Sequence, residues 1–337
     1  MGVNLKEIAR MAGVSTTTVS RVLNGKAPGN MSRETYEKVM RVVELTGFAP
    51  NPVASSLRSG SSKVIGVILP SSTNPYYAQL GSYIENEAYN NGHLIFVCNS
   101  NSDVARERSY IDTLRNHRVS GILLCSTGLT SREIQGLRES NTRCVLLDEE
   151  VGDYPGDIVV GDDFRGGRMG AEYLYRLGHR DILVILGPEQ LSSTRNRLAG
   201  FRSFFSSVAD ARHAIANGDF TIQSGYVAVN EKLPGTPFTA VFSFNDLMAI
   251  GAIHALQRGG VKVPGDVSVL GYDNIFIDHY VSPGITTVST PLDELARIAV
   301  AMVIRRPAAP VAAVGRRSIP PRIIERESCA RPPGAPQ

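Results

Sequence analysis

The chain contains no tryptophan, only four cysteines and no long apolar segment. No apolar run approaches the roughly 20 residues that a membrane-spanning helix needs, and the N-terminus lacks the apolar stretch of a signal peptide. Cys98, Cys125, Cys144 and Cys329 have no CxxC or zinc-ligand spacing. Three of them lie in apolar, strand-like runs, so we expect reduced, buried thiols. These absences predict a cytoplasmic protein.

The sequence also lacks the common motifs of catalysis and cofactor binding. It has no GxGxxG after a predicted strand, no GxxxxGK[ST] and no GxSxG, and its six histidines form no HxxxH pair. His179 precedes a predicted strand and is interpreted as a capping or packing residue. The glycines of GDDFRGGRMG (161–170) favour a closely packed helix start over a nucleotide-binding loop. We therefore expect no enzymatic activity, no cofactor and no metal.

Charge is concentrated at one end of the chain. Residues 1–60 hold eight Lys and Arg against four Asp and Glu, a net charge of about +4, whereas the other 277 residues are close to neutral, at about −1. A small basic segment on a neutral body is typical of nucleic-acid binding. The length of 337 residues suits two or three domains.

The segment LKEIARMAGVSTTTVSRVLN (5–24) predicts two short helices joined by a tight turn. Apolar residues recur at helical spacing on one face of each helix, Gly13 suits the left-handed turn that ends the first, and Ser15 is a good N-cap for the second. This is the pattern of a helix-turn-helix, whose second helix lies in the DNA major groove. The inward-facing residues are Leu5, Ile8, Ala9, Ala12, Val19, Val22 and Leu23.

An ordinary helical hairpin would share that pattern, so the neighbouring residues are needed to distinguish it from a helix-turn-helix. The outward face of the second helix carries Thr16, Thr17, Ser20 and Arg21, whose hydroxyls and guanidinium suit base edges and phosphates. A third amphipathic helix follows Ser32 and ends at Gly47, and we expect it to complete a three-helix core. Its expected core residues are Tyr36, Val39, Met40 and Val43.

From Lys63 onward, continuous apolar runs alternate with helical segments. Continuous runs indicate strands covered on both faces, and the alternation predicts βαβ units with parallel sheets in two similar α/β lobes. The strands are expected at 64–70, 94–100, 121–125, 144–148, 158–161, 181–187, 239–244, 268–272, 286–290 and 322–325. The helices between them are expected at about 75–91, 104–117, 131–139, 163–177, 193–208, 222–232 and 246–258, with one more after 290.

Polar and aromatic residues follow these predicted strands. Ligands of open parallel sheets bind at the carboxyl ends of the strands, so such residues are expected around one cleft. Carboxylates, an arginine and an amide can hydrogen-bond vicinal hydroxyls, while an aromatic ring can stack on a sugar face. For Ser193, Asp162, Asp163, Asp246 and Asp273, a helix-capping role is an equally good interpretation.

The sequence resembles the LacI/GalR family of bacterial transcription regulators. IARMAGVSTTTVSRVLNG (8–25) is similar to its DNA-binding head and APNPVASSLRSG (49–60) to its hinge. VIGVILPSSTNPYYAQL (64–80), VVGDDFRGGRMGAEYLYRLGHRDILVILG (159–187) and VPGDVSVLGYDN (263–274) are similar to its effector-binding core. The resemblance covers residues 4 to 328 and implies a core like the periplasmic sugar-binding proteins, with two lobes that the chain crosses three times.

The resemblance also implies a domain organisation. It consists of an all-α helix-turn-helix head (1–48), a hinge (49–62) and an α/β core of two parallel-sheet lobes (63–328). Lobe 1 spans about 63–160 and 290–318, lobe 2 about 161–289 and 319–328, and a disordered tail follows at 329–337. Composition alone leaves a flexible tether as the alternative for the hinge.

Site residues follow from the resemblance by motif position. DNA contacts are expected at Thr16, Thr17, Ser20, Arg21, Asn24, Leu57 and Arg58, with Leu57 entering the minor groove as a wedge. Effector contacts are expected at Tyr76, Asp148, Arg197, Phe220, Asn245 and Asp273.

Three departures from the family pattern qualify what is expected. Ser55 replaces a hinge arginine, Leu191 stands where the purine-responsive branch carries an arginine, and the segment between Phe201 and Gly218 is short. No C-terminal leucine heptad is present, which disfavours a coiled-coil tetramer.

We predict a homodimeric repressor of carbohydrate-utilisation genes that a small sugar-like effector releases from a pseudopalindromic operator. The alternatives are an activator or corepressor-dependent repressor of the same family and, more distantly, a solute-binding protein.

Overall fold

The computed structural model describes residues 3–23, 31–48, 62–139, 142–235, 237–305 and 315–334. Its internal contacts divide the chain into two units, Met1–Ser62 and Lys63–Gln337. Among the described residues, no helix combines the length and the apolar character needed to cross a bilayer. All four cysteines are free thiols, with Cys125 and Cys144 buried and Cys98 and Cys329 partly buried.

The first unit is a bundle of three helices, α1 (Leu5–Ala12), α2 (Thr16–Leu23) and α3 (Arg33–Thr46). Asn4 and Glu7 form a capping box at the start of α1, and Gly13 ends it at φ 64°. The bundle closes over a core of small and branched side chains: Ile8, Ala9, Ala12, Val19, Val22 and Val39. The expectation that Tyr36 joins this core is wrong, because its side chain is 41% exposed.

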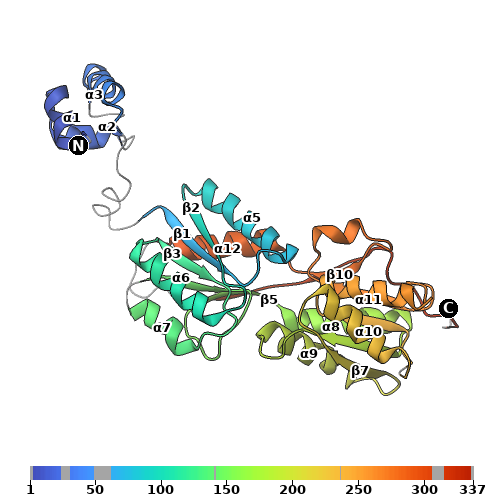
Figure 1. Ribbon diagram of the computed structural model, residues 1–337. Helices are drawn as coiled ribbons and strands as arrows, with labels where there is room; N and C mark the ends of the chain where they lie inside the picture. Colours follow the sequence, from blue (N-terminus) through green and yellow to red (C-terminus); the bar gives the residue numbers. More distant parts are fainter. Residues whose placement is uncertain are drawn as a thin grey trace. The chain divides into compact units, whose positions relative to one another are not determined.

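The second unit contains two six-stranded sheets, each the centre of one lobe (Figure 1). In lobe 1 the strand order is β11-β5-β4-β3-β1-β2 and every pairing is parallel. The strands are β1 (Val64–Leu69), β2 (Leu94–Asn99), β3 (Gly121–Leu124), β4 (Cys144–Leu147), β5 (Asp157–Gly161) and β11 (Arg316–Ile319). Helices cover both faces: α5 (Pro75–Asn90) and α12 (Leu292–Ile304) pack in one apolar cluster, α6 (Val104–Asn116) and α7 (Ser131–Glu139) in another.

Lobe 2 has the strand order β12-β10-β9-β8-β6-β7, parallel except for the last strand to join, β12. The strands are β6 (Asp181–Leu186), β7 (Arg212–Asn217), β8 (Ala240–Ser243), β9 (Ser268–Tyr272), β10 (Thr286–Ser289) and β12 (Arg322–Ile324). The helices are α8 (Asp163–Leu177), α9 (Ser192–Phe205), α10 (Ile222–Lys232) and α11 (Asp246–Arg258), with a 3-10 turn η1 (Phe276–His279). α8 packs against α9, and α10 against α11.

Three crossings of the chain join the lobes, after β5, between β10 and α12, and between β11 and β12. Although the segment between Phe201 and Gly218 is short, it still forms strand β7, so lobe 2 keeps six strands. Neither β7 nor β11 was expected, because their residues lack a continuous apolar run.

Two expectations about exposure are wrong. Strand β2 is not covered on both faces: it is the sheet edge, and Leu94, Phe96 and Val97 are 48–64% exposed. The tail from Cys329 to Gly334 is not disordered. The backbone carbonyl of Ala330 accepts hydrogen bonds from Ser268 at 3.0 Å and contacts His179 Nε2 at 2.9 Å, while Cys329 packs against the core of lobe 2.

Candidate functional site

One cavity lies between the two lobes. All six residues expected to contact an effector lie in its lining, together with three others. The nine are Asn74, Tyr76, Tyr77, Asp148, Ser193, Arg197, Phe220, Asn245 and Asp273.

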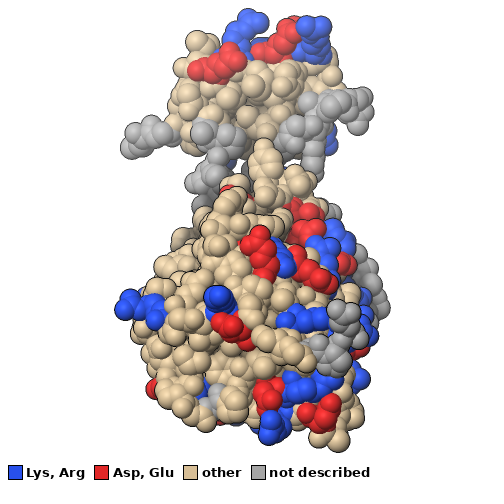
Figure 2. Space-filling view, turned by 90° about the vertical axis from the view of Figure 1, so that its right-hand side faces the viewer, with Lys and Arg blue, Asp and Glu red and all other residues tan. Residues whose placement is uncertain are grey.

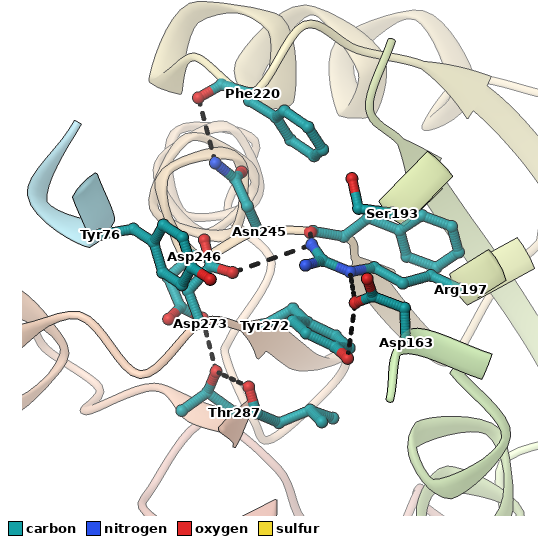
Figure 3. A network of polar contacts seen from close by, with 12 residues as sticks. Tyr76, Asp163, Ser193, Arg197, Phe220, Asn245, Asp246, Tyr272, Asp273 and Thr287 are labelled. Carbon is teal, nitrogen blue, oxygen red and sulfur yellow. Dashed lines mark hydrogen bonds and ion pairs between the residues drawn. The ribbon is translucent and has the colours of Figure 1, made fainter. Parts of the chain in front are cut away.

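Sheet topology explains why residues so far apart in sequence meet here. The carboxyl ends of parallel strands lie at the same edge of a sheet. In lobe 1, the segment after β1 contributes Asn74, Tyr76 and Tyr77, and the loop after β4 contributes Asp148. In lobe 2, the segments after β6, β7, β8 and β9 contribute the other five. Figure 3 shows several of these side chains converging from different elements.

Tyr76 and Asp148 form the lobe 1 side of the cavity. Asn74 caps α5 by accepting a hydrogen bond from the backbone N–H of Tyr76 at 3.0 Å, which holds Tyr76 at the helix start. The Tyr76 hydroxyl donates to Asp148 Oδ1, and both side chains are buried. Burial raises the pKa of Asp148, while the Tyr76 hydroxyl partly opposes that rise.

Arg197 forms the floor on the lobe 2 side. Its Nε donates to Asp163 Oδ1 at 2.8 Å, one terminal nitrogen donates to the carbonyl of Phe244, and that nitrogen lies 3.8 Å from Asp273 Oδ1 (Figure 3). The guanidinium stacks 3.7 Å from the ring centroid of Tyr272. The positive charge of Arg197 is therefore balanced by carboxylates of its own lobe.

Close backbone packing positions α9. A Cβ atom at Gly167 of α8 would lie 1.9 Å from the carbonyl oxygen of Arg197, and one at Gly200 of α9 would lie 1.9 Å from that of Phe164. Only glycine permits this approach. The interpretation of the GDDFRGGRMG glycines as a closely packed helix start is confirmed.

Phe220 supplies an aromatic ring from the loop after β7. It adopts φ 67°, and its carbonyl accepts a hydrogen bond from Asn245 Nδ2 at 3.1 Å. The Asn245 side-chain oxygen accepts from Met248 N at 2.9 Å, which caps α11. Asn245 therefore links the start of α11 to the loop that carries Phe220.

Glu149 is a buried polar residue that the sequence analysis missed. It follows Asp148 in lobe 1 and accepts hydrogen bonds from Ser192 and Ser193 at the start of α9 in lobe 2. The available signal was its position directly after a predicted strand end. Its partner could not be identified, because no sequence pattern links the two lobes at this point.

The cavity is rich in hydrogen-bond acceptors. Asp148 and Asp273 both line it, and burial raises the pKa of Asp273 well above its ordinary value despite the attraction of Arg197. Carboxylates bind hydroxyl donors, while Tyr76 and Phe220 offer apolar ring surfaces. Among the lining residues Arg197 is the cation, and it is already paired. The described residues hold no group of three or more His, Cys, Asp or Glu side chains arranged for a metal ion.

The head presents the expected polar face on α2. Thr16, Thr17 and Arg21 are exposed, and Ser20 is half-buried. Ser15 caps the helix by accepting a hydrogen bond from Thr18 N at 3.1 Å. The other three expected DNA contacts, Asn24, Leu57 and Arg58, lie outside the described residues, as do hinge residues 49–61.

A helix-turn-helix head followed by a two-lobed core with an interlobe cavity defines a class of protein, the ligand-responsive DNA-binding regulators. Residues 4–51 match the model for bacterial regulatory proteins of the lacI family, and residues 171–329 match a periplasmic binding protein-like domain. The chain is 34% identical to the HTH-type transcriptional repressor PurR of Vibrio campbellii over 314 residues, covering 90% of this chain and 91% of that protein. The chain belongs to the LacI family of transcription regulators, which are not enzymes.

Solved structures of similar proteins share this architecture. The lac repressor dimer bound to operator and the anti-inducer ONPF superposes with a TM-score of 0.85 at 28% identity, covering 98% of this chain and 100% of that one. A LacI family regulator from Enterococcus faecalis with bound ribose has a TM-score of 0.73 at 32% identity, covering 80% and 99%. Similar proteins have therefore been solved both on operator DNA and with a sugar bound.

Proposed function

We propose that this protein represses carbohydrate-utilisation genes and leaves a pseudopalindromic operator when a small sugar-like effector binds between its lobes. The observation that carries the proposal is the convergence of Tyr76, Asp148, Phe220, Asn245 and Asp273 with Arg197 on one cavity. Carboxylates and an amide around a polar cavity, with aromatic rings beside them, match the donors and the apolar face of a sugar.

The charge of the cavity favours a sugar without a phosphate group. The guanidinium of Arg197 is already engaged by Asp163 and Asp273, and Asp148 adds a further acidic group. An anionic effector would meet carboxylates without an unpaired cation. Leu191, in place of the arginine of the purine-responsive branch, disfavours a nucleobase.

Exposed apolar side chains support a homodimer. Tyr89 and Leu94 of lobe 1 are 74% and 64% exposed, and Phe276 and Tyr280 of lobe 2 are 60% and 84% exposed. Exposed large apolar side chains are typical of association surfaces where they gather, and each lobe carries at least two of them. Figure 2 also shows a wide part of the visible core surface without Lys, Arg, Asp or Glu. A two-fold dimer would match the symmetry of a pseudopalindromic operator.

DNA recognition is assigned to the exposed face of α2. Thr16, Thr17, Ser20 and Arg21 would contact base edges and phosphates, while Asn24, Leu57 and Arg58 would add contacts at the end of α2 and in the hinge. The effector acts through its different affinities for the DNA-bound and free states, with a coupling of typically ~1–3 kcal/mol.

A thermal-shift screen of the purified protein tests the effector class. Free sugars, sugar phosphates, polyols and nucleosides are compared on the wild type and on Asp148→Asn, with the exposed Asp153→Asn as the matched control. A ligand at 100 times its Kd stabilises by about 2.7 kcal/mol, which gives a shift of several degrees. We expect free sugars to stabilise the wild type and the control but not Asp148→Asn. Stabilisation by nucleosides or sugar phosphates alone would overturn the sugar assignment.

An operator-binding assay with and without the stabilising sugar tests the direction of control. Release from DNA supports induction. Tighter binding with the sugar would instead establish a corepressor-dependent repressor.

A further inference from the structure

Glu149 connects the two lobes through one carboxylate. It belongs to the loop between β4 and β5 of lobe 1, and its partners belong to α9 of lobe 2. Oε2 accepts from Ser193 N at 3.1 Å and from the Ser192 hydroxyl at 2.5 Å, while Oε1 accepts from the Ser193 hydroxyl. We call these contacts of Glu149 with Ser192 and Ser193 the interlobe latch.

The latch supplies the side-chain N-cap that α9 lacks. The N-cap residue of α9 is Leu191, which has no side-chain acceptor for the first N–H groups of the helix. The carboxylate of Glu149 takes that place and also meets the positive end of the helix dipole. Since Ser193 lines the cavity, Glu149 fixes the orientation of a hydroxyl that faces the effector.

Among the described residues, no lysine or arginine forms an ion pair with Glu149. The ionisable groups around it are Asp148 on its own loop, Asp163 on α8, Tyr77 on α5 and Cys125 after β3. The nearby arginines are engaged elsewhere, Arg197 with Asp163 and Arg316 with the neighbouring Glu150. Burial, followed by repulsion from Asp148, raises the pKa of Glu149 to about 7, although the two serine hydroxyls act against the rise.

We propose that Glu149 is a positioning residue which latches lobe 1 to the start of α9 and couples closing of the cleft to the uptake of one proton. The proposal rests on the assignment of this cleft as the effector site. Under this proposal the affinity of the regulator for its effector depends on pH, because the proton on Glu149 changes how Ser193 can hydrogen-bond a ligand.

The proton changes which way the Ser193 hydroxyl points. When Glu149 is ionised, the serine O–H donates to Oε1 and Ser193 offers only lone pairs to the cavity. When Glu149 takes a proton from solvent, Oε1–H donates to Ser193 Oγ, and the serine proton is free to donate to a bound ligand. Oε2 keeps accepting from Ser192 and Ser193 N in both forms, so the latch persists.

The sign of the pH effect follows from the raised pKa. An open cleft hydrates Glu149 and returns it to its ordinary pKa near 4.5, whereas the closed cleft holds it at about 7. Between those values the closed form carries one proton more, so closure is favoured as pH falls. A ligand that binds the closed form is expected to bind about tenfold more tightly at pH 6 than at pH 8.

The lobe geometry can be tested without any ligand. Spin labels on Gln135→Cys of α7 and Ala199→Cys of α9, both exposed positions, report the interlobe distance in the full chain. Cys98 and Cys329 are replaced by serine, and labelled protein is diluted with unlabelled protein. The distance distribution is measured by pulsed electron resonance from pH 5.5 to 8.5.

Three variants are expected to show different pH dependences of the interlobe distance. Glu149→Gln imitates the protonated side chain, so we expect the short distance at every pH. Glu149→Ala removes the latch, so we expect the long distance at every pH. Glu150→Gln, the adjacent carboxylate paired with Arg316, is expected to titrate like the wild type near pH 7. A wild-type distance that does not change with pH, or Glu149→Gln titrating like the wild type, would overturn the latch.

Calorimetry with D-ribose as the probe separates this proposal from the effector assignment. Proton uptake is measured in buffers of different ionisation enthalpy, and we expect Glu149→Gln to take up about one proton fewer than the wild type on binding. If no sugar binds while the distance still titrates through Glu149, the latch stands and the sugar assignment fails. If ribose binds with the same proton uptake in both proteins, the latch fails and the sugar assignment stands.

Discussion

Asp163 and Arg197 form an ion pair inside lobe 2, with 2.8 Å between Asp163 Oδ1 and Arg197 Nε and only 8% of each side chain exposed. The Tyr272 hydroxyl donates to the same carboxylate oxygen at 3.0 Å. Burial raises the pKa of Asp163, and the adjacent guanidinium partly opposes that rise. The pair therefore holds the cavity floor together as well as facing a ligand.

Replacing Arg197 with alanine is expected to destabilise lobe 2 as well as the binding site. It leaves the Asp163 carboxylate buried without its counter-ion, which typically costs about 3–5 kcal/mol. The exposed pair of Arg212 with Asp181, in which the arginine is 80% exposed, is the matched control, and Arg212→Ala should cost at most about 1 kcal/mol. Urea unfolding measures the free energy of unfolding of both variants. Equal losses in the two variants would contradict the structural role of the buried pair.

Gly167→Ala is expected to separate α8 from α9. The added methyl group would meet the backbone carbonyl of Arg197, and overpacking of this kind costs about 1–3 kcal/mol. Gly136→Ala in α7 is the control, because outside its own helix turn no described atom lies within 4 Å of the added carbon and alanine favours a helix by roughly 0.5–1 kcal/mol. Thermal unfolding should show opposite shifts. A neutral Gly167→Ala would mean that the two helices can move apart freely.

Asp278 predicts a pH dependence of stability. Its carboxylate is buried, with Oδ2 3.9 Å from Arg326 Nη1, and burial raises its pKa to about 7 although hydrogen bonding with Asp246 and the charge of Arg326 act against the rise. The folded state then keeps a proton that the unfolded state releases, so this residue lowers the free energy of unfolding as pH rises from about 4 to 7. Asp278→Asn should remove part of this fall in the free energy of unfolding with pH, and it should stabilise the protein at pH 8 by on the order of 1–3 kcal/mol. Urea unfolding at pH 5.5 and pH 8 checks this, and unchanged slopes would refute it.

Removing the tail after Ser328 is expected to destabilise lobe 2. The truncation deletes the Ala330 carbonyl, which leaves buried His179 with fewer partners, and each lost hydrogen bond costs about 0.5–1.5 kcal/mol. Truncation after Gly334 removes only residues 335–337 and serves as the control. Differential scanning calorimetry should distinguish the two. Identical transitions would show that the tail adds nothing to stability.

Gly13→Ala is expected to weaken the DNA-binding head. Gly13 ends α1 at φ 64°, a conformation that costs an alanine roughly 1–2 kcal/mol. Met11→Ala, at a side chain 51% exposed on the same helix, is the control. Fluorescence anisotropy with operator DNA should show a loss of affinity for Gly13→Ala alone. Equal affinity for both variants would mean that the turn tolerates a Cβ.

Much of the fold follows from local patterns in the sequence. Continuous apolar runs specify buried parallel strands, and helix bounds follow from caps such as Asn74, Asp162 and Gly178. The cleft residues could be located as well, because a polar residue after a parallel strand must lie at the shared carboxyl edge. The resemblance to known regulators then identified six residues that line one cavity.

Tertiary structure decided what no local pattern encodes. The exposed edge strand β2 has the same apolar composition as a buried one, since exposure depends on its place in the sheet. Ala330 is held by hydrogen bonds with His179 and Ser268, and the Cys329 thiol donates to the carbonyl of Val269, so the tail is ordered by groups distant in the sequence. Glu149 gains its partners only when lobe 1 meets α9, and its raised pKa comes from that burial. Sequence determined the helices, the strand-end residues and all strands except β7 and β11, because those depend on neighbours along the chain. The interlobe latch, the buried ion pair and the docked tail depend on groups that only folding brings together.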